Sequence, residues 1–150
     1  MGCTGAIRLI LRAAPAVAAA LVLSGCSSYS PITAQRIEKA IASTFANLVE
    51  TQVAWIELPP LTAAEVAASA NCLKLPTGGV GAGEWVCTVI WMGPQGQSVR
   101  DAYDLFVATD GCYMASLSGE SLGGPILKTK DGRAVRNLLY AFDGCFDTTT

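Results

Sequence analysis

Histidine is absent from the 150-residue sequence. This excludes catalysis by a Ser-His-Asp or Cys-His arrangement, and it excludes every metal site that needs an imidazole ligand. The nucleophile pattern Ser-x-x-Lys, the phosphate loop Gly-x-x-x-x-Gly-Lys and the zinc pattern His-Glu-x-x-His are missing as well. We therefore expect a protein that is not an enzyme and that uses neither a metal nor a cofactor.

Basic residues are few and scattered along the chain. Ten Lys and Arg stand against twelve Asp and Glu, which gives a formal net charge of −2. The sequence has no run of basic residues and no interleaving of basic with aromatic residues, so nucleic acid is not an expected partner. The glycine-rich segment 77–84 (TGGVGAGE) lacks the lysine of a phosphate loop, and we interpret it as a flexible loop.

The apolar block at 13–23 is short for a membrane span. Its eleven residues, at about 1.5 Å each in a helix, cover roughly half of the ~30 Å hydrocarbon core. Arg8 and Arg12 precede the block, and no acidic residue occurs before position 38. A positive start, a short apolar middle and small residues at its end are typical of a secretory signal peptide.

The residues at 23–26, LSGC, resemble the lipobox of bacterial lipoproteins. The resemblance implies that residues 1–25 are removed as a signal peptide and that the thiol of Cys26 carries a diacylglyceryl group as a thioether. Residues 26–31 would then be a lipidated tether, and membrane lipid would be the first partner. Two or three acyl chains, at about 0.8 kcal/mol per buried CH₂, hold such a protein on the extracytoplasmic face of the cell membrane. The alternative is a plain secretory signal that leaves a free cysteine.

Four further cysteines follow: Cys72, Cys87, Cys112 and Cys145. An even number of cysteines in an exported chain indicates disulfides, and the tight Cys-x-x-Cys pairs that zinc usually needs are absent. Three pairings are possible. We favour Cys72–Cys87, because that bridge closes a loop around the glycine-rich segment, together with Cys112–Cys145.

A sequence echo also favours the second pair. Segment 109–113 (TDGCY) and segment 142–146 (FDGCF) both place Asp-Gly, a tight-turn pair, before a cysteine and an aromatic residue. In the chain-entropy model, each of the two disulfides stabilises the fold by roughly 3–4 kcal/mol.

The first part of the chain that would remain after removal of the signal peptide has the sequence pattern of a helix. Ser30 and Pro31 suit a helix start, and the spacing of apolar residues predicts an amphipathic helix over 31–52 with one face for a core. A short strand is expected at 53–58, and Thr62 and Glu65 have the spacing of a capping box, which predicts a short second helix. The apolar stripe of the long helix is Ile37, Ile41, Phe45, Leu48 and Val49.

From residue 84 the period of hydrophobicity changes to two, which is typical of strands. We expect strands at 84–92, 102–109 and 112–117 and in the segments that flank a turn at 130–132. The predicted fold is α+β: an N-terminal amphipathic helix packed on a four- or five-stranded antiparallel sheet, stapled by disulfides, in a single domain over 32–150. Cystatin-like and nuclear-transport-factor-like folds are the nearest shapes.

The spacing of Cys72, Trp85 and Cys87, followed by a strand of period two, is similar to small secreted domains of uncharacterised actinobacterial envelope proteins. The similarity extends over residues 70–115. It implies an envelope lipoprotein and points to no particular activity.

We therefore expect a non-catalytic binding or interaction module of the cell envelope, whose partner is an envelope protein or an apolar ligand. A sheet under a single helix often leaves a concave face, and Trp55, Trp85, Trp91 and Tyr103 are candidate lining residues. For each of these aromatic side chains, a place in the core is the competing interpretation.

Two alternatives remain open. The protein is a structural envelope component that acts through its anchor and surface, or it is a carboxylate-based hydrolase. The hydrolase would use Asp101 and Asp104, with Glu84 across the hairpin, because paired acids perform glycosidic chemistry. Solvated charges near strand ends are the competing interpretation of these three residues.

Overall fold

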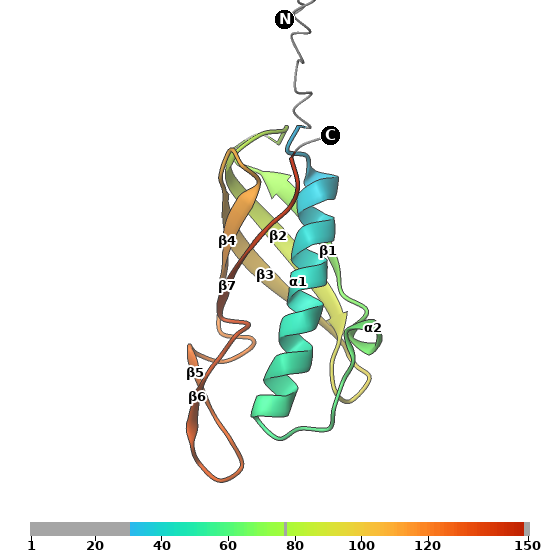
Figure 1. Ribbon diagram of the computed structural model, residues 1–150, viewed down its shortest axis with the longest axis vertical. Helices are drawn as coiled ribbons and strands as arrows, with labels where there is room; N and C mark the ends of the chain where they lie inside the picture. The colour runs from blue at the N-terminus through green and yellow to red at the C-terminus, as the bar shows by residue number, and fades with distance from the viewer. Residues whose placement is uncertain (1–30, 77, 149–150) are drawn as a thin grey trace, which may run out of the picture.

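The computed structural model describes residues 31–76 and 78–148. The expected signal peptide, Cys26 and most of the expected tether lie outside these residues. The chain forms one long helix, one short helix, a five-stranded antiparallel sheet and a two-stranded arm, in the α+β arrangement that the sequence predicts (Figure 1).

The long helix α1 runs from Ala34 to Trp55. It begins three residues later than predicted, with Thr33 at its N-cap, and it ends three residues later. The predicted strand at 53–58 is wrong. Val53 is buried and continues the apolar stripe of the helix, so packing overrides the strand preference of this short segment. The buried side chains of α1 are Ile37, Ile41, Phe45, Ala46, Val49, Gln52 and Val53.

The short helix α2, Ala63–Val66, has the capping box that the sequence predicts. The Thr62 backbone N–H donates to Glu65 Oε2 at 2.8 Å, and the Glu65 backbone N–H donates to Thr62 Oγ1 at 3.3 Å. The Thr62 hydroxyl also donates to Glu65 Oε2, at 2.8 Å. The pKa of the Glu65 carboxyl is lowered by the bond from the Thr62 backbone N–H and, to a smaller extent, by the bond from the Thr62 hydroxyl. The capped helix α2 lies in the connection between α1 and the first strand of the main sheet.

The main sheet has the strand order β1-β2-β3-β4-β7, and every neighbouring pair is antiparallel. The two predicted hairpins are present, with the turn at 93–97 between β2 and β3. The strand predicted at 102–109 begins earlier than expected, at Ser98, and ends at Val107. The strand β1 was not predicted. The strand bounds are β1 Ser69–Lys74, β2 Gly83–Met92, β3 Ser98–Val107, β4 Cys112–Leu117 and β7 Ala141–Cys145.

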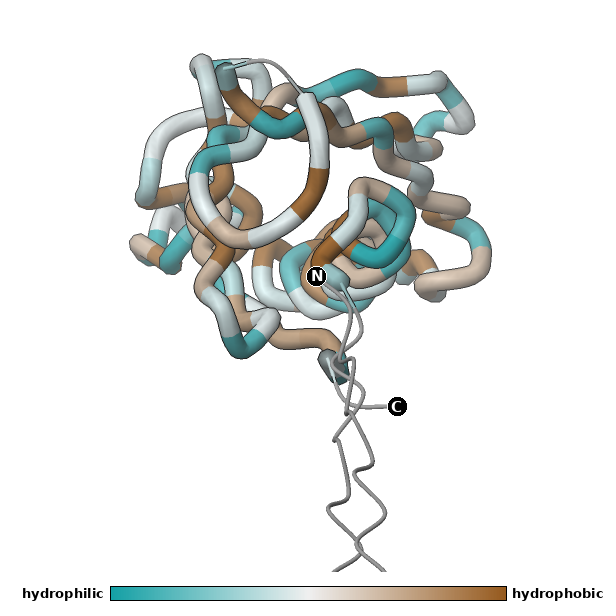
Figure 2. Tube along the Cα trace, turned by 90° about the horizontal axis from the view of Figure 1, so that it is seen from above, coloured by the Kyte–Doolittle hydropathy of each residue, from teal (hydrophilic) through white to brown (hydrophobic). Residues whose placement is uncertain are grey.

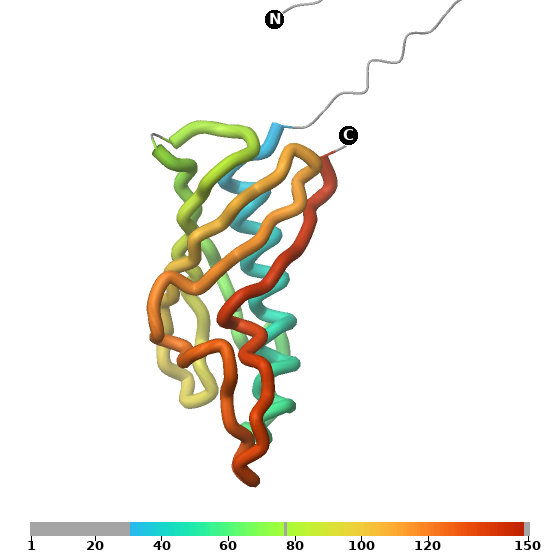
Figure 3. The backbone as a smooth tube through the Cα atoms, turned by 90° about the vertical axis from the view of Figure 1, so that its left-hand side faces the viewer, coloured from blue at the N-terminus to red at the C-terminus, as the bar shows by residue number. Residues whose placement is uncertain are grey.

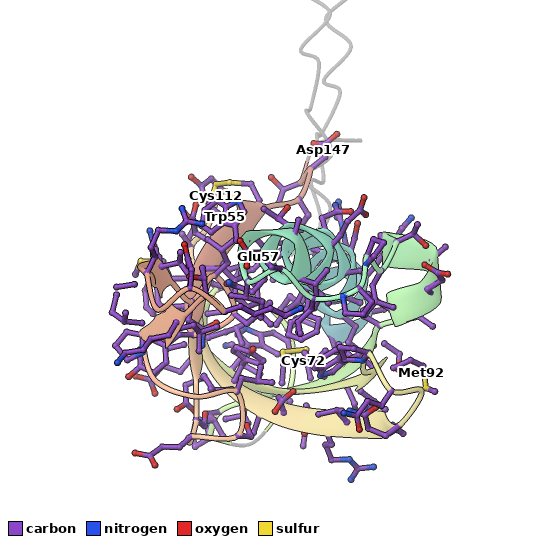
Figure 4. The ribbon with its side chains drawn as sticks, turned by 90° about the horizontal axis from the view of Figure 1, so that it is seen from below. Trp55, Glu57, Cys72, Met92, Cys112 and Asp147 are labelled. Carbon is purple, nitrogen blue, oxygen red and sulfur yellow. A yellow bond between two sulfur atoms is a disulfide. The ribbon has the colours of Figure 1, made fainter. Side chains whose placement is uncertain are left out.

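The sheet curves around α1, and the core lies between them (Figures 2 and 4). Phe45 of α1 meets the rings of Trp91 and Tyr103 edge to face, with centroids 5.5 and 6.0 Å apart. The Tyr103 hydroxyl donates to the Leu139 carbonyl at 2.8 Å, so its polar tip is satisfied inside the core. These contacts fix the helix against one face of the sheet.

A two-stranded arm, β5 Ile126–Lys128 and β6 Ala134–Arg136, precedes β7. Asn137 is buried at its base, where the side-chain amide donates to the carbonyls of Leu122 and Gly124 at 2.9 and 3.0 Å. The arm projects from one end of the molecule, while both ends of the described chain lie at the other (Figures 1 and 3).

Two disulfides join strands that are direct neighbours, in the pairing favoured from the sequence: Cys72–Cys87 and Cys112–Cys145. The first lies in the core, with its cysteines 2% and 0% exposed, between α1 and the sheet (Figure 4). In the second, Cys112 is half-buried and Cys145 is exposed. The two bridges therefore differ in access to solvent.

Candidate functional site

The face of the five-stranded sheet that is turned away from α1, here called the outer face, carries large apolar side chains. Side chains alternate between the faces of a strand, so the neighbours of buried Leu105, Val107 and Tyr113 point outward. Two of those neighbours are Phe106, 54% exposed, and Met114, 64% exposed. Side chains of this kind on a solvent face are the usual mark of an interaction surface when they adjoin one another.

The strand register aligns these residues with two acids. Glu84 of β2 lies opposite Phe106 of β3, Phe106 lies opposite Met114 of β4, and Met114 lies opposite Asp143 of β7. We call these four residues the outer row. The row places an aromatic ring and a thioether side by side and ends on each side in an exposed carboxylate.

The apolar surface continues toward the edge strand β1. Leu75 follows β1, and its backbone N–H donates to the Glu84 carbonyl at 2.9 Å, so it lies beside that end of the outer row. Leu73, which is 65% exposed, pairs with Val86 on the same face. Each of the four neighbouring strands β1 to β4 therefore contributes an apolar side chain to the outer face, beside the carboxylates.

Two open hollows lie on either side of the pair Phe106 and Met114. One has a volume of about 380 Å³ and includes Glu84 and Asp104 in its lining. The other, of about 510 Å³, includes Asp143 and the exposed Cys112–Cys145 disulfide. Each hollow thus combines an apolar floor with at least one carboxylate, an arrangement suited to a side chain that is apolar along its length and cationic at its tip.

The four aromatic residues proposed from the sequence do not line a ligand site. Trp85, Trp91 and Tyr103 are buried in the core, because α1 fills the concave side of the sheet on which they lie. Trp55 is 46% exposed at the last position of α1 and does not belong to the core cluster that contains the other three. The concave face exists, and the protein's own helix occupies it.

The three acids proposed for a hydrolase do not come together either. Asp101 is 1% exposed on the face that α1 covers, where its Oδ2 accepts a 2.7 Å hydrogen bond from the Trp91 indole N–H. Asp104 and Glu84 lie on the outer face and line the same hollow. The sheet therefore separates Asp101 from the other two.

The sequence did not lead us to predict the outer row. Phe106 lies between Leu105 and Val107, so residues 105–108 form a continuous apolar run in which the outward residue does not stand out. Met114 and Asp143 lie in different hairpins, and only the register of β4 with β7 brings them together. The one signal for the outer row in the sequence was that two large apolar residues, Phe106 and Met114, occupy outward positions of the predicted strands.

Neither a metal centre nor a membrane span is found in the described part of the chain. Within residues 31–76 and 78–148, no cluster of three or more His, Cys, Asp or Glu side chains is arranged to hold a metal ion. In the same residues, no helix has both the length and the apolar character needed to cross a membrane. Comparisons with protein families, with curated proteins and with solved structures give no match.

Proposed function

We propose that this protein is a lipid-anchored, extracytoplasmic lipoprotein whose domain is a non-catalytic binding module, with the outer face of the sheet as its binding surface. The observation that carries the binding role is the outer row, in which Phe106 and Met114 are exposed side by side between two carboxylates. An exposed aromatic and a methionine cost solubility unless a partner covers them.

The anchor is supported by the LSGC sequence at 23–26 and by the two disulfides, which form and persist in an oxidising compartment outside the cytosol. From Cys26 to Pro31 the chain advances five residues, which span at most ~18 Å when fully extended. The end of the domain at which α1 begins would then face the membrane. The arm, at the opposite end, would point away from it (Figure 3).

The anchor is tested on the full chain expressed in a bacterium that processes lipoproteins. We expect the detergent-extracted protein to begin at Cys26 and to carry the mass of a diacylglyceryl group and an added acyl chain. The Cys26→Ser variant should lose this mass and leave the detergent phase. A wild-type chain that begins elsewhere, or that lacks the lipid mass, would contradict the anchor.

The binding surface is tested separately by photo-crosslinking in living cells. Benzoylphenylalanine is introduced in place of Phe106 and, as the matched control, in place of Trp55, an aromatic residue of similar exposure outside the outer face. We expect a discrete adduct from position 106 that disappears when Met114→Lys is added, and none from position 55. Equal adducts from both positions would refute a binding role for the outer face. No adduct from position 106 would favour a structural envelope component instead.

A further inference from the structure

We infer that the partner of the outer row is an extended polypeptide segment with the pattern basic–x–apolar–x–basic, which crosses the strands of the sheet. This inference rests on the proposal that the outer face binds a partner. It adds the chemical class and the conformation of that partner, both derived from the order and spacing of the side chains in the outer row.

The sign of the charges selects a basic partner. Glu84 and Asp143 end the row, and Asp104 lies on the same face, two residues before Phe106 in β3. Arg100, the basic residue at an outward position of β3, lies six residues before Phe106, and the linings of the two hollows include no Lys or Arg. The surface around Phe106 and Met114 is therefore acidic, and cationic groups complement it.

The spacing selects an extended segment. Glu84 and Asp143 lie on strands three intervals apart, and at roughly 4.8 Å per interval their backbones are ~14 Å apart across the sheet. An extended chain advances ~3.4 Å per residue and presents every second side chain on one face. Residues i and i+4 are thus ~14 Å apart and share a face with residue i+2. Bases at i and i+4 reach the two carboxylates, while an apolar residue at i+2 covers Phe106 and Met114.

A second copy of this chain fits the outer row less well. Two copies packed through their outer faces would bring the carboxylates of both rows together, which opposes association. The arm carries the four bases Lys128, Lys130, Arg133 and Arg136, but it lies at the end of the domain opposite to the turn that follows Phe106 (Figure 1). Copies anchored side by side in one membrane would hold the arm and the outer row at different heights.

The inference is tested by NMR on the detergent-solubilised full chain with its methionine methyl groups labelled with ¹³C. Met114 reports on the outer row, and Met92, at the far end of β2, is an internal control outside it. The probe is a capped seven-residue peptide with the order glycine, lysine, serine, leucine, serine, lysine, glycine. We expect the peptide to shift the Met114 signal in a saturable manner and to leave the Met92 signal in place.

Two controls establish the role of charge. A peptide with glutamate in place of both lysines should leave Met114 unshifted. The double variant Glu84→Gln and Asp143→Asn should bind the lysine peptide about fivefold more weakly, because two exposed ion pairs of ordinary strength are lost. The matched variant Glu57→Gln and Glu120→Gln removes the same charge away from the outer row and should bind as the wild type does. An unchanged Met92 signal in each variant reports that the fold is intact.

Three results would overturn the inference. The first is an equal Met114 shift with the glutamate peptide, and the second is no Met114 shift with the lysine peptide at saturating concentration. The third is a Met114 signal that moves with protein concentration alone as the particle mass doubles, which would assign the outer row to a second copy. If the photo-crosslink at position 106 forms while the lysine peptide fails, the binding surface stands and only the partner chemistry is wrong.

Discussion

Native-state reduction should open the Cys112–Cys145 disulfide long before the Cys72–Cys87 disulfide. Thiol–disulfide exchange requires the attacking thiolate to reach a sulfur atom. Cys145 is exposed on the outer face, whereas Cys72 and Cys87 are 2% and 0% exposed beneath α1. The second bridge reacts without unfolding, and the first reacts only when the sheet separates from the helix.

The buried bridge closes the shorter loop, yet we expect its removal to lower the free energy of unfolding more than removal of the exposed bridge does. The sequence separations are 15 and 33 residues, for which the chain-entropy model gives about 3 and about 3.7 kcal/mol, respectively. On entropy alone, the longer loop of Cys112–Cys145 is worth ~0.7 kcal/mol more. Removal of the buried bridge also deletes two sulfur atoms from the core, at roughly 1 kcal/mol each if a sulfur is treated like a methylene. Burial therefore outweighs loop length, and the buried bridge should be worth more in total, about 5 kcal/mol.

The assay compares Cys72→Ala with Cys87→Ala, as a double variant, against the double variant Cys112→Ser with Cys145→Ser. Urea unfolding should give losses in the free energy of unfolding of about 5 and about 3.7 kcal/mol, respectively. Alkylation and mass spectrometry after mild phosphine treatment of the wild type report which bridge opens first. A larger loss from the exposed pair, or first opening of the buried pair, would refute the reasoning from burial.

Three further predictions concern the fold. Gly111→Ala places a Cβ 2.5 Å from a backbone carbonyl oxygen of the C-terminal segment at a φ of +85°, whereas Gly96→Ala, at a φ of +74°, has nothing within 4 Å. We expect Gly96→Ala to cost about 1–2 kcal/mol and Gly111→Ala clearly more, as measured by urea unfolding. A double-mutant cycle of Asp101→Ala and Trp91→Phe should give a coupling of about 1–3 kcal/mol, because their hydrogen bond is buried; a coupling near zero would contradict that. Burial, and then the negative charge of Asp101, raises the pKa of Tyr103. The unfolded chain therefore loses this proton from about pH 10 while the folded chain keeps it, so the free energy of unfolding should fall above that pH and fall less steeply in Tyr103→Phe.

The sequence was sufficient to predict the elements in which the local residue pattern and the tertiary packing favour the same secondary structure. The apolar stripe from Ile37 to Val49 predicted the long helix, and the residues of that stripe that are fully buried meet the sheet. The capping box at Thr62 and Glu65 predicted α2, because a local pair of hydrogen bonds specifies it without tertiary contacts. The Asp110-Gly111 turn also formed as expected, with Asp110 Oδ1 accepting from the Cys112 N–H at 3.0 Å.

The elements that were missed depend on contacts between distant residues. The strand β1 has the sequence SANCLK, which has little strand preference of its own. It pairs with β2 over six residues and is covalently joined there at Cys72. It also donates a bond to the helix, from the Cys72 backbone N–H to Glu38 Oε1 at 2.9 Å. The wrong strand at 53–58 has the same kind of cause, because the core captures Val53 as part of α1.

The same distinction explains why three of the four aromatic residues that the sequence offers as ligand contacts lie in the core. The large aromatic residues Trp85, Trp91 and Tyr103 attract attention as ligand contacts, yet α1 covers them, so their area contributes to stability. Phe106 and Met114 contribute little to the core because they point away from it, and it is this exposure on which the proposed binding role rests. Side chains alternate between the two faces of a strand, and α1 covers one of these faces. Every second residue of a strand is therefore buried against α1, and the residues between them point outward. The exposure of an aromatic residue in this sheet is therefore set by whether its position in the strand is inward or outward.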